Sequence, residues 1–488
     1  MTTERQKVYI RLIRLKGFLQ LFLRNKMAFT GLLVLVIMVS AAVAAPLITP
    51  YDPQASVVSG TLAAPFWSEY ITGSAGRSQN ARFPTATLQG TGQGFSSSLI
   101  STSDTGAEFS VTADGSQPAG SRVQLVSTLN WPYKGTPLRF SGNAIVKAQG
   151  VSDATRVVVN VCFTRVGETG ANCAASPWVL WRENVTVSGK EYSPRILFDS
   201  NDENLKKYLG FASTYLRPSE VIFSKPAAYT YSMDMILPAG VPLQLTVTVP
   251  EFTMQLYGNT WGLMGTDNQG RDVFTQVVYG VRLSLVIGLL AAGIGISLGL
   301  VIGLVAGYIK GVVDEVLMRF TDMMLVIPGL PLLIVLVAVL SPSLWNIIAI
   351  LGFLGWMGFA RLVRSQVLSI RERPFIEAAK ASGAGTGYAI TRHIFPNIVG
   401  LTYVNLALSV PGAIVGEAAL SFLGLFDPNV ITWGRMLNEA QVAGGSATQI
   451  LWWWIIPPGL GIAILSLSFI LVGYALDEIF NPRLRRRR

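Results

Sequence analysis

Six long apolar stretches constrain the fold of this 488-residue chain more than any other feature of its sequence. About 20 apolar residues span the hydrocarbon core of a bilayer as a helix, so each stretch predicts a transmembrane helix. The predicted spans are residues 27–48, 283–307, 323–340, 344–360, 398–423 and 451–476. Half of the residues are hydrophobic and only 14% are charged, which excludes an ordinary soluble protein and a disordered chain.

The lysine and arginine residues predict how these helices are oriented. Twenty of them lie in the tail before residue 27, in the connection between the second and third spans, in residues 361–397 and in the tail after Pro482. The short connections on the opposite side contain only Arg435. Because basic residues concentrate on the cytoplasmic side of a bilayer, we expect both termini in the cytoplasm. The formal net charge of +10 then reflects membrane topology, and nucleic acid is not an expected partner.

Residues 54–261 contain no apolar stretch of spanning length, and their periodicity is two. Apolar residues alternate with other residues at 157–163 and at 243–249. Further strands are expected at 122–127, 143–148 and 179–187. We therefore expect an extracytoplasmic all-β, sandwich-like domain inserted between the first and second membrane helices. One short helix is expected at 202–209, with Asn201 as its cap.

Cys162 and Cys173 flank a glycine-containing stretch that is typical of a hairpin loop. On the outer side of a membrane a disulfide between them would persist and would stabilise the fold by about 3 kcal/mol. The alternative is two reduced cysteines packed as small apolar side chains. One histidine and two cysteines leave no residue set for a zinc cluster or a histidine-based triad. We expect neither a metal site nor a catalytic site.

A short helix is expected within the cytoplasmic stretch 361–397. Pro374 can open this helix, because its missing N–H would be unpaired there in any case, and Gly383 can close it. Small residues lie on one side of the helix, with charges around them. Small side chains would let the helix backbone sit deep in a groove of another protein. The alternative is a solvated loop with incidental helicity.

One family resemblance bears on this loop. Glu377-Ala378-Ala379, followed by Gly383 and by the run from Arg392 to Asn397, resembles the EAA loop of binding-protein-dependent ABC importer permeases. In that family the loop forms a coupling helix that docks into a cleft of the ATPase subunit. The resemblance assigns the coupling role to Glu377, Ala378, Ala379, Gly383, Arg371, Arg373 and Lys380. Phe395 stands where leucine is usual, and this variant looks like the dipeptide, oligopeptide and nickel branch.

Further segments fit the same branch. Residues 24–26 and 51–53 resemble the N-terminal module of its C-type subunit. Gly265-Thr266-Asp267 with Gly270-Arg271-Asp272 resembles the segment before its second helix, and residues 417–424 and 433–435 also look similar to the family. The departure is the insertion, because the family has only a short linker in its place.

The resemblance implies an ABC importer permease of type I, with six transmembrane helices, in a prokaryotic plasma membrane. It also implies three kinds of partner: a homologous second permease subunit in a heterodimer, two ATPase subunits and an external substrate-binding protein. The chain has no Gly-x-x-x-x-Gly-Lys-Ser/Thr phosphate loop, so we expect ATP and Mg²⁺ in the partner ATPases and no cofactor on this chain.

The expected cargo of such a permease is a di- or oligopeptide, with nickel, a small glycan or an opine as alternatives. The alternative function is a membrane-anchored sensor, or a carrier with an outer domain that ATP does not drive. A sensor usually needs a cytoplasmic output domain, and a carrier would lack the docking loop.

Two further residue sets lie in or near the predicted spans. Gly295, Gly299, Gly303 and Gly307 repeat every four residues and predict close helix packing. Glu417 is the only carboxylate well inside a predicted span, where an ionisable group is usually functional. We expect an outer gate or an ion pair there, with Arg271 or Arg282 as the partner and with Asp267 and Asp272 near that site. A purely structural ion pair is the alternative.

The expected organisation has five parts. They are a basic cytoplasmic tail at 1–26, a first helix at 27–48, the outer β-domain at 54–261, a permease core at 262–476 with the coupling loop 361–397, and a basic tail at 477–488. The residues of the β-domain do not distinguish between docking the binding protein, shielding it and contacting substrate.

Overall fold

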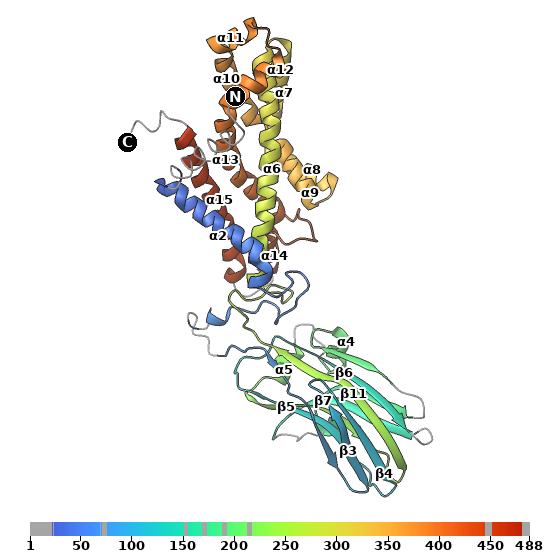
Figure 1. Cartoon of the computed structure of the whole chain (residues 1–488). Coiled ribbons are helices and arrows are strands. Elements are labelled where there is room, and N and C mark those ends of the chain that lie inside the picture. Colours follow the sequence, from blue (N-terminus) through green and yellow to red (C-terminus); the bar gives the residue numbers. More distant parts are fainter. Residues whose placement is uncertain are drawn as a thin grey trace, which may run out of the picture. The chain divides into compact units, whose positions relative to one another are not determined.

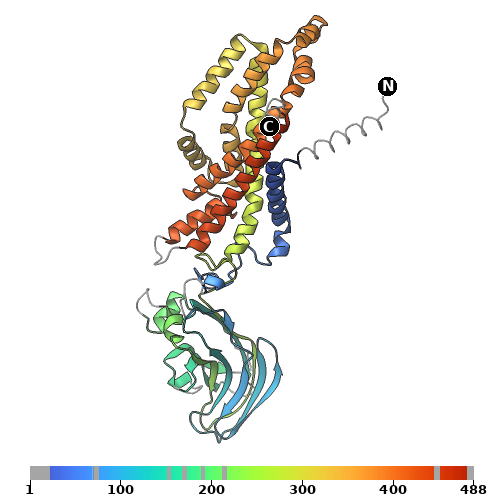
Figure 2. The ribbon, with the colours of Figure 1, turned by 90° about the vertical axis from the view of Figure 1, so that its left-hand side faces the viewer.

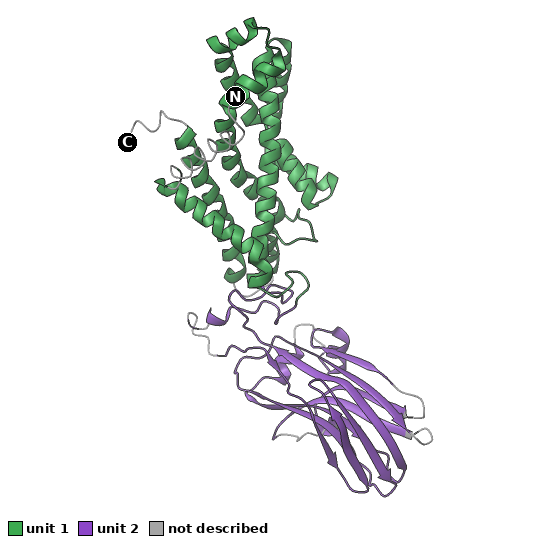
Figure 3. Cartoon of the chain, viewed as in Figure 1, with its two compact units in different colours: residues 1–56, 273–488 green, residues 57–272 purple. Residues whose placement is uncertain are grey.

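A computed structural model describes residues 22, 24–68, 70, 76–150, 155–167, 173–187, 193–211, 217–444 and 451–480. The chain forms two compact units, coloured separately in Figure 3. Unit 1 comprises Met1–Ser56 and Val273–Arg488, and unit 2 comprises Val57–Asp272. The predicted basic tails, 1–26 and 477–488, lie largely outside the described residues.

Unit 1 is a bundle of apolar helices (Figure 1). The longest are α2 (Lys26–Ile48), α6 (Val273–Ile309), α13 (Phe395–Phe422) and α15 (Trp452–Phe480). The others are α7 (Val312–Val326), α8 (Gly329–Leu340), α9 (Leu344–Leu354), α10 (Met357–Arg371), α11 (Pro374–Ala381), α12 (Thr386–Tyr388), the π-helix η3 (Ala389–Ile394) and α14 (Trp433–Gly444). Among the described residues, five helical segments are long and apolar enough to cross a membrane, with α9 and α10 counted as one.

The third predicted span, 323–340, is wrong as a single straight helix. It contains the end of α7 and all of α8, and these two helices meet at an angle of 89°. The break is at Ile327 and Pro328, which have extended backbone conformations. A proline disfavours the helical conformation of the residue before it, so the apolar run continues while the helix does not. Counting the bent pair as one span raises the number of spans to six.

Two other boundaries differ from the prediction. Helix α6 begins at Val273, ten residues before the predicted start at 283, and α10 continues to Arg371 through the first part of the predicted loop. Helix α10 buries Ala360, Val363, Val367 and Ile370. This spacing forms one apolar face of a helix whose other face is polar, so a criterion of continuous hydrophobicity ends the span too early.

Unit 2 is a β-sandwich of two antiparallel sheets (Figure 2). The six-stranded sheet has the order β3-β4-β11-β6-β9, with β1 also paired to β11, and the five-stranded sheet has the order β2-β5-β10-β7-β8. The first sheet comprises β1 (Ala81–Arg82), β3 (Phe95–Thr102), β4 (Ala107–Asp114), β6 (Arg139–Gly150), β9 (Arg195–Asp199) and β11 (Pro242–Tyr257). The second comprises β2 (Thr87–Thr91), β5 (Arg122–Trp131), β7 (Thr155–Arg165), β8 (Trp178–Val187) and β10 (Ala227–Ile236). The predicted all-β fold is confirmed.

One core fills the space between the two sheets. Leu243, Leu245, Val247 and Val249 of β11 are buried, as their alternation predicts, and Phe163 of β7 packs among Phe83, Phe140 and Tyr231. Among its described residues, unit 2 also contains four short helices: η1 (Phe66–Ser68), η2 (Cys173–Ala175), α4 (Glu203–Tyr208) and α5 (Pro218–Ile222). The predicted cap of α4 is wrong by one residue, because the Asp202 side chain, and not Asn201, accepts the Asn204 N–H.

The chain enters and leaves unit 2 through one set of hydrogen bonds. The entering segment pairs with the leaving segment at Val57 and Arg271 and at Ala64 and Thr260. The Thr266 hydroxyl donates to the Gly60 carbonyl and accepts the Ala63 N–H. Because of these bonds, residues 262–272 belong to unit 2, although the sequence analysis assigned them to the permease core.

Candidate functional site

Helix α11 is the short helix expected in the cytoplasmic loop. Pro374 occupies its first turn, and Arg373 is its N-cap. After Ala381 the chain turns through Gly383, which has a φ of +85°, a conformation that glycine adopts without steric cost. The Gly383 N–H donates to the Lys380 carbonyl and the Ala384 N–H donates to the Ala379 carbonyl, so the orphan carbonyl groups of the helix end are satisfied.

One buried side chain anchors α11 to the membrane helices. Ile376 is fully buried in a cluster with Val367 of α10, Tyr308 of α6 and Ile394 of η3. By contrast, Glu377, Ala378 and Gly383 are exposed. The helix is therefore fixed on one side, and it presents its small residues on the other.

The exposed side of α11 borders a depression of about 680 Å³. The depression is lined by Phe375, Ala378, Ala379, Ser382, Gly383, Ala384, Gly385, Tyr388 and His393. The rings of Phe375 and Tyr388 lie 6.5 and 5.6 Å from the ring of His393. A depression lined by both small residues and aromatic rings can accept side chains of a second protein. His393 lies within the motif from Arg392 to Asn397, but no sequence pattern predicted a role for Phe375 or Tyr388.

Two residues assigned to coupling by resemblance lie against α6. Arg371 is buried and donates hydrogen bonds to the carbonyl oxygens of Gly307, at 3.4 Å, and Tyr308, at 3.0 Å. The Lys380 ammonium group lies 5.2 Å from the centre of the Tyr308 ring. Cations at the C-terminal end of a helix stabilise its unpaired carbonyl groups. Arg371 and Lys380 therefore connect the loop to the end of α6. Of the three basic residues to which the resemblance assigns a coupling role, only Arg373 takes no part in these contacts.

The glycine row of α6 faces α9 and α10. A Cβ atom added to Gly299 would lie 2.6 Å from the Trp356 carbonyl oxygen, and one added to Gly303 would lie 2.6 Å from the Ala360 carbonyl oxygen. At Gly307 the nearest atom would be Cβ of Val367, at 2.7 Å. The first glycine of the row, Gly295, lies against Gly352 and Gly355. Without side chains in this row the two helices approach to backbone contact, so displacement of α10 would be transmitted to α6.

A second depression lies among the membrane helices. It has a volume of about 370 Å³ and is lined by small and apolar residues of α6, α8, α9 and α13, among them Ala291, Gly295, Leu333, Ser409 and Gly416. None of the described residues that line it is charged. The surface is therefore suited to an apolar helix or to the uncharged part of a solute.

Glu417 of α13 is buried, and its carboxylate is bonded to hydroxyl groups. The Ser421 hydroxyl donates to Glu417 Oε1 at 2.7 Å, and the Thr432 side chain forms a second hydrogen bond. The expected neighbours Asp267, Arg271 and Asp272 belong to unit 2, where Arg271 Nε is 2.5 Å from Asp267 Oδ2. Asp267 also accepts the N–H groups of Gln269 and Arg271 and so shapes the turn before α6.

Helix α14, which positions Thr432 beside Glu417, was not predicted as a helix. The Trp433 indole N–H donates to the Val277 carbonyl at 3.0 Å, and the ring packs against Gly280 and Gly461. Arg435 donates to the carbonyl oxygens of Pro428 and Val430 and to Glu439. Buried Trp433, Met436, Ala440 and Ala443 repeat at helical spacing, and this amphipathic pattern was the signal available in the sequence.

In unit 2 the two cysteines are joined by a disulfide. The bond attaches η2 to β7, and the backbone N–H of Cys173 donates to Asp234 Oδ2 of β10 at 2.9 Å. Gln124 Nε2 donates to the other oxygen of Asp234 at 2.7 Å. Burial nevertheless raises the pKa of the Asp234 carboxyl above its usual value, because desolvation outweighs these hydrogen bonds and the charge of Arg122.

Two family models match the chain. Residues 299–486 match the binding-protein-dependent transport system inner membrane component, and residues 14–65 match the N-terminal transmembrane domain of oligopeptide transport permease C. The dipeptide transport system permease protein DppC of Bacillus subtilis is 38% identical over 225 residues, which are 46% of this chain and 69% of that protein. The chain belongs to this family of ABC importer permeases. The oligopeptide transport system permease protein OppC of Bacillus subtilis is 36% identical to the permease, over 46% of this chain and 72% of that protein.

Two solved structures match parts of the permease at low identity. The methionine ABC transporter MetNI in an inward-facing conformation has 18% identity and a TM-score of 0.33, covering 42% of this chain and 95% of that one. A family 11 carbohydrate-binding module from Clostridium thermocellum has 12% identity and a TM-score of 0.18, covering 37% of this chain and 89% of that one. Family membership makes the permease a multi-pass membrane protein and a transport subunit that works with ATPase subunits and a binding protein.

Proposed function

We propose that the permease translocates di- or oligopeptides that an external binding protein delivers, and that ATP hydrolysis in partner subunits drives the transport. The peptide cargo is supported by relatives that are named as dipeptide and oligopeptide permeases. The observation that carries the coupling proposal is helix α11, with Ile376 buried and with Glu377, Ala378 and Gly383 exposed. The chain itself supplies no catalysis in this proposal, and ATP with Mg²⁺ is bound by the ATPases.

The contacts of α11 support a mechanical route from the ATPase to the membrane helices. When the ATPases close, they would push on the exposed face of α11. Ile376 would pass the displacement to α10, and Arg371 would pass it to the end of α6. Because the glycine row keeps α6 and α10 in backbone contact, these helices would move together and change the side to which the pathway opens.

The permease forms a heterodimer with a homologous subunit in this proposal. The uncharged depression among α6, α8, α9 and α13 supports it, because a second apolar helix would bury this surface. Both termini lie in the cytoplasm and unit 2 lies outside. The basic residues of the short connections support this orientation, and so does the disulfide in unit 2, since disulfides persist in oxidising compartments.

The coupling proposal is tested in the reconstituted complex with the double variant Glu377→Ala/Gly383→Ala. We expect peptide uptake to fall by at least about tenfold, since the docking contact and the positive-φ turn are both lost. Uptake into vesicles, ATPase activity and co-purification of the ATPase are measured together. The control is Glu315→Ala, which removes an exposed carboxylate of α7 that pairs with Arg319 on the same helix. Uptake at the wild-type rate in the double variant would refute the coupling role.

A further inference from the structure

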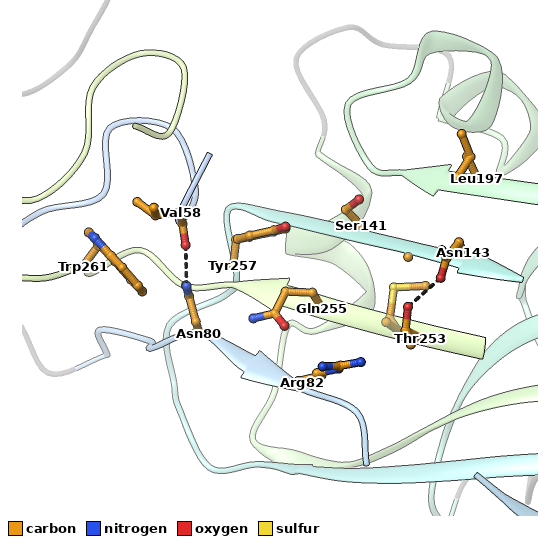
Figure 4. A pocket seen from close by; sticks show the side chains of 12 residues that line it. Val58, Asn80, Arg82, Ser141, Asn143, Leu197, Thr253, Gln255, Tyr257 and Trp261 are labelled. Carbon is orange, nitrogen blue, oxygen red and sulfur yellow. Dashed lines mark hydrogen bonds between the residues drawn. The ribbon is translucent and has the colours of Figure 1, made fainter. Parts of the chain in front are cut away.

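A polar groove lies on the outward face of the six-stranded sheet of unit 2 (Figure 4). Its volume is about 540 Å³, within the range of small-molecule sites. The side chains that matter for its chemistry come from β1, β6 and β11 and from the segment after β11: Arg82, Ser141, Asn143, Gln255, Tyr257 and Trp261. All of the groove belongs to unit 2, and the transport function proposed above assigns it no role.

Strand pairing arranges these side chains in rows. Arg82 is the cross-strand partner of Gln255, and Gln255 is the partner of Ser141. Directly paired residues have their Cβ atoms roughly 5 Å apart, so these three side chains form one line of polar groups across the groove. Thr253 and Asn143 form a second row on the same face of the sheet, two residues away from the first row along β11 and β6. Figure 4 shows Gln255 between Arg82 and Tyr257.

The second row and the aromatic ring are held in place by their neighbours. Asn143 Oδ1 accepts a hydrogen bond from the Thr253 hydroxyl at 2.5 Å, and Asn143 Nδ2 donates to Glu251. The guanidinium group of Arg139 lies 5.4 Å from the centre of the Tyr257 ring and pairs with Asp199. These contacts order the groove before a ligand binds, which lowers the entropic cost of binding.

In contrast, the side chains of the first row, Arg82, Gln255 and Ser141, have hydrogen-bonding groups that can bind a ligand. Among the residues that the structure describes, the side chains of Arg82, Ser141 and Gln255 form no hydrogen bond or ion pair with the protein. An amide side chain such as that of Gln255 both donates and accepts, as does a hydroxyl group. Within the described part of the chain, the lining contains one cation, Arg82, and no carboxylate.

This chemistry points to one class of ligand. Hydroxyl groups of a sugar both donate and accept, which matches Gln255 and Ser141, and Arg82 can donate two parallel hydrogen bonds to neighbouring hydroxyls. The rings of Tyr257 and Trp261 give the groove aromatic surface for the apolar C–H face of a sugar ring. A free peptide would find no carboxylate among the described lining residues for its ammonium group, and the single cation among them is too few for nucleic acid. We propose that unit 2 binds a saccharide in this groove.

The test uses the full-length permease in lipid nanodiscs. Saturation-transfer difference NMR and calorimetric titration would be run with cellotetraose, chitotetraose and galactotriose, and with trialanine as the peptide probe. Sedimentation with isolated peptidoglycan distinguishes an envelope polymer from a free oligosaccharide. We expect binding of at least one saccharide, and Gln255→Ala or Ser141→Ala should weaken it by about fivefold or more, since each removes a hydrogen bond. The matched control is Gln244→Ala, an exposed glutamine on the same strand outside the groove.

Three outcomes would overturn the proposal. The first is that neither the oligosaccharides nor peptidoglycan bind to folded permease. The second is that a saccharide binds but Gln255→Ala and Ser141→Ala leave its affinity unchanged. The third is that trialanine binds in a manner sensitive to Gln255, which would make the groove a peptide subsite. Peptide uptake by the complete complex reconstituted into vesicles, measured alongside, distinguishes failure of this proposal from failure of the transport function.

Discussion

Removal of the disulfide between Cys162 and Cys173 should destabilise unit 2 by an amount that follows from the loop length. The two residues are 11 apart in the sequence, and closing a loop of this size removes about 2.8 kcal/mol of chain entropy from the unfolded state. This energy corresponds to a factor of about 100 in the equilibrium constant for unfolding. The slowest-exchanging amides of unit 2 should therefore exchange about 100-fold faster in Cys162→Ala/Cys173→Ala. For a unit of roughly 216 residues, the same energy lowers the melting temperature by about 6 °C.

Hydrogen exchange read by mass spectrometry is the suitable assay, because it follows unit 2 separately from the membrane helices. Strand β10 is the region to monitor, since it lies between β5 and β7 and is buried along most of its length. Reducing the wild-type protein should reproduce the effect, whereas the same reductant should leave the double variant unchanged. If free thiols are found in native protein, or if β10 exchange changes by less than about threefold, the reasoning is refuted.

Two other predictions concern single residues. The raised pKa of Asp234 means that its contribution to the stability of unit 2 is fully present below the pKa of the unfolded carboxyl and is lost as the pH rises through the higher folded pKa. Relative to wild type, Asp234→Asn should therefore gain unfolding free energy between pH 4 and pH 7, and parallel pH profiles would contradict this. In α6, Gly303→Ala should destabilise the helix bundle by about 1–3 kcal/mol through overpacking against α10. Gly293→Ala, where an added Cβ meets no atom within 4 Å, should leave the stability of the bundle unchanged. Thermal unfolding of both variants tests this, and equal losses of stability would show that close packing of Gly303 against α10 does not matter.

Much of the architecture follows from local patterns. The apolar run of α2 agrees with its predicted span to within one residue, and the two-residue period of 243–249 lies in β11 with its apolar side buried. Pro374 and Gly383 delimit α11 because both act through their own backbone conformations, which do not depend on distant contacts. Such features are visible in the sequence since hydrophobic burial and local sterics determine them.

Other features depend on residues that are distant in the sequence. Arg371, to which the resemblance assigns a coupling role, lies buried against the end of α6, and nothing near it in the sequence identifies Gly307 and Tyr308 as its partners. The polar groove of unit 2 also depends on residues that are distant in the sequence, because Arg82, Ser141 and Gln255 become neighbours only through the register of three strands.

Hydrophobicity and its periodicity were thus enough to assign a helical membrane unit with an inserted β-sandwich, because the transfer of apolar side chains out of water depends mainly on composition and spacing. The tertiary structure was needed to show the 89° bend between α7 and α8, the hydroxyl partners of Glu417 and the rows of the groove. Each of these depends on how separate elements pack and pair, and many arrangements of the same elements would satisfy the same hydrophobic pattern.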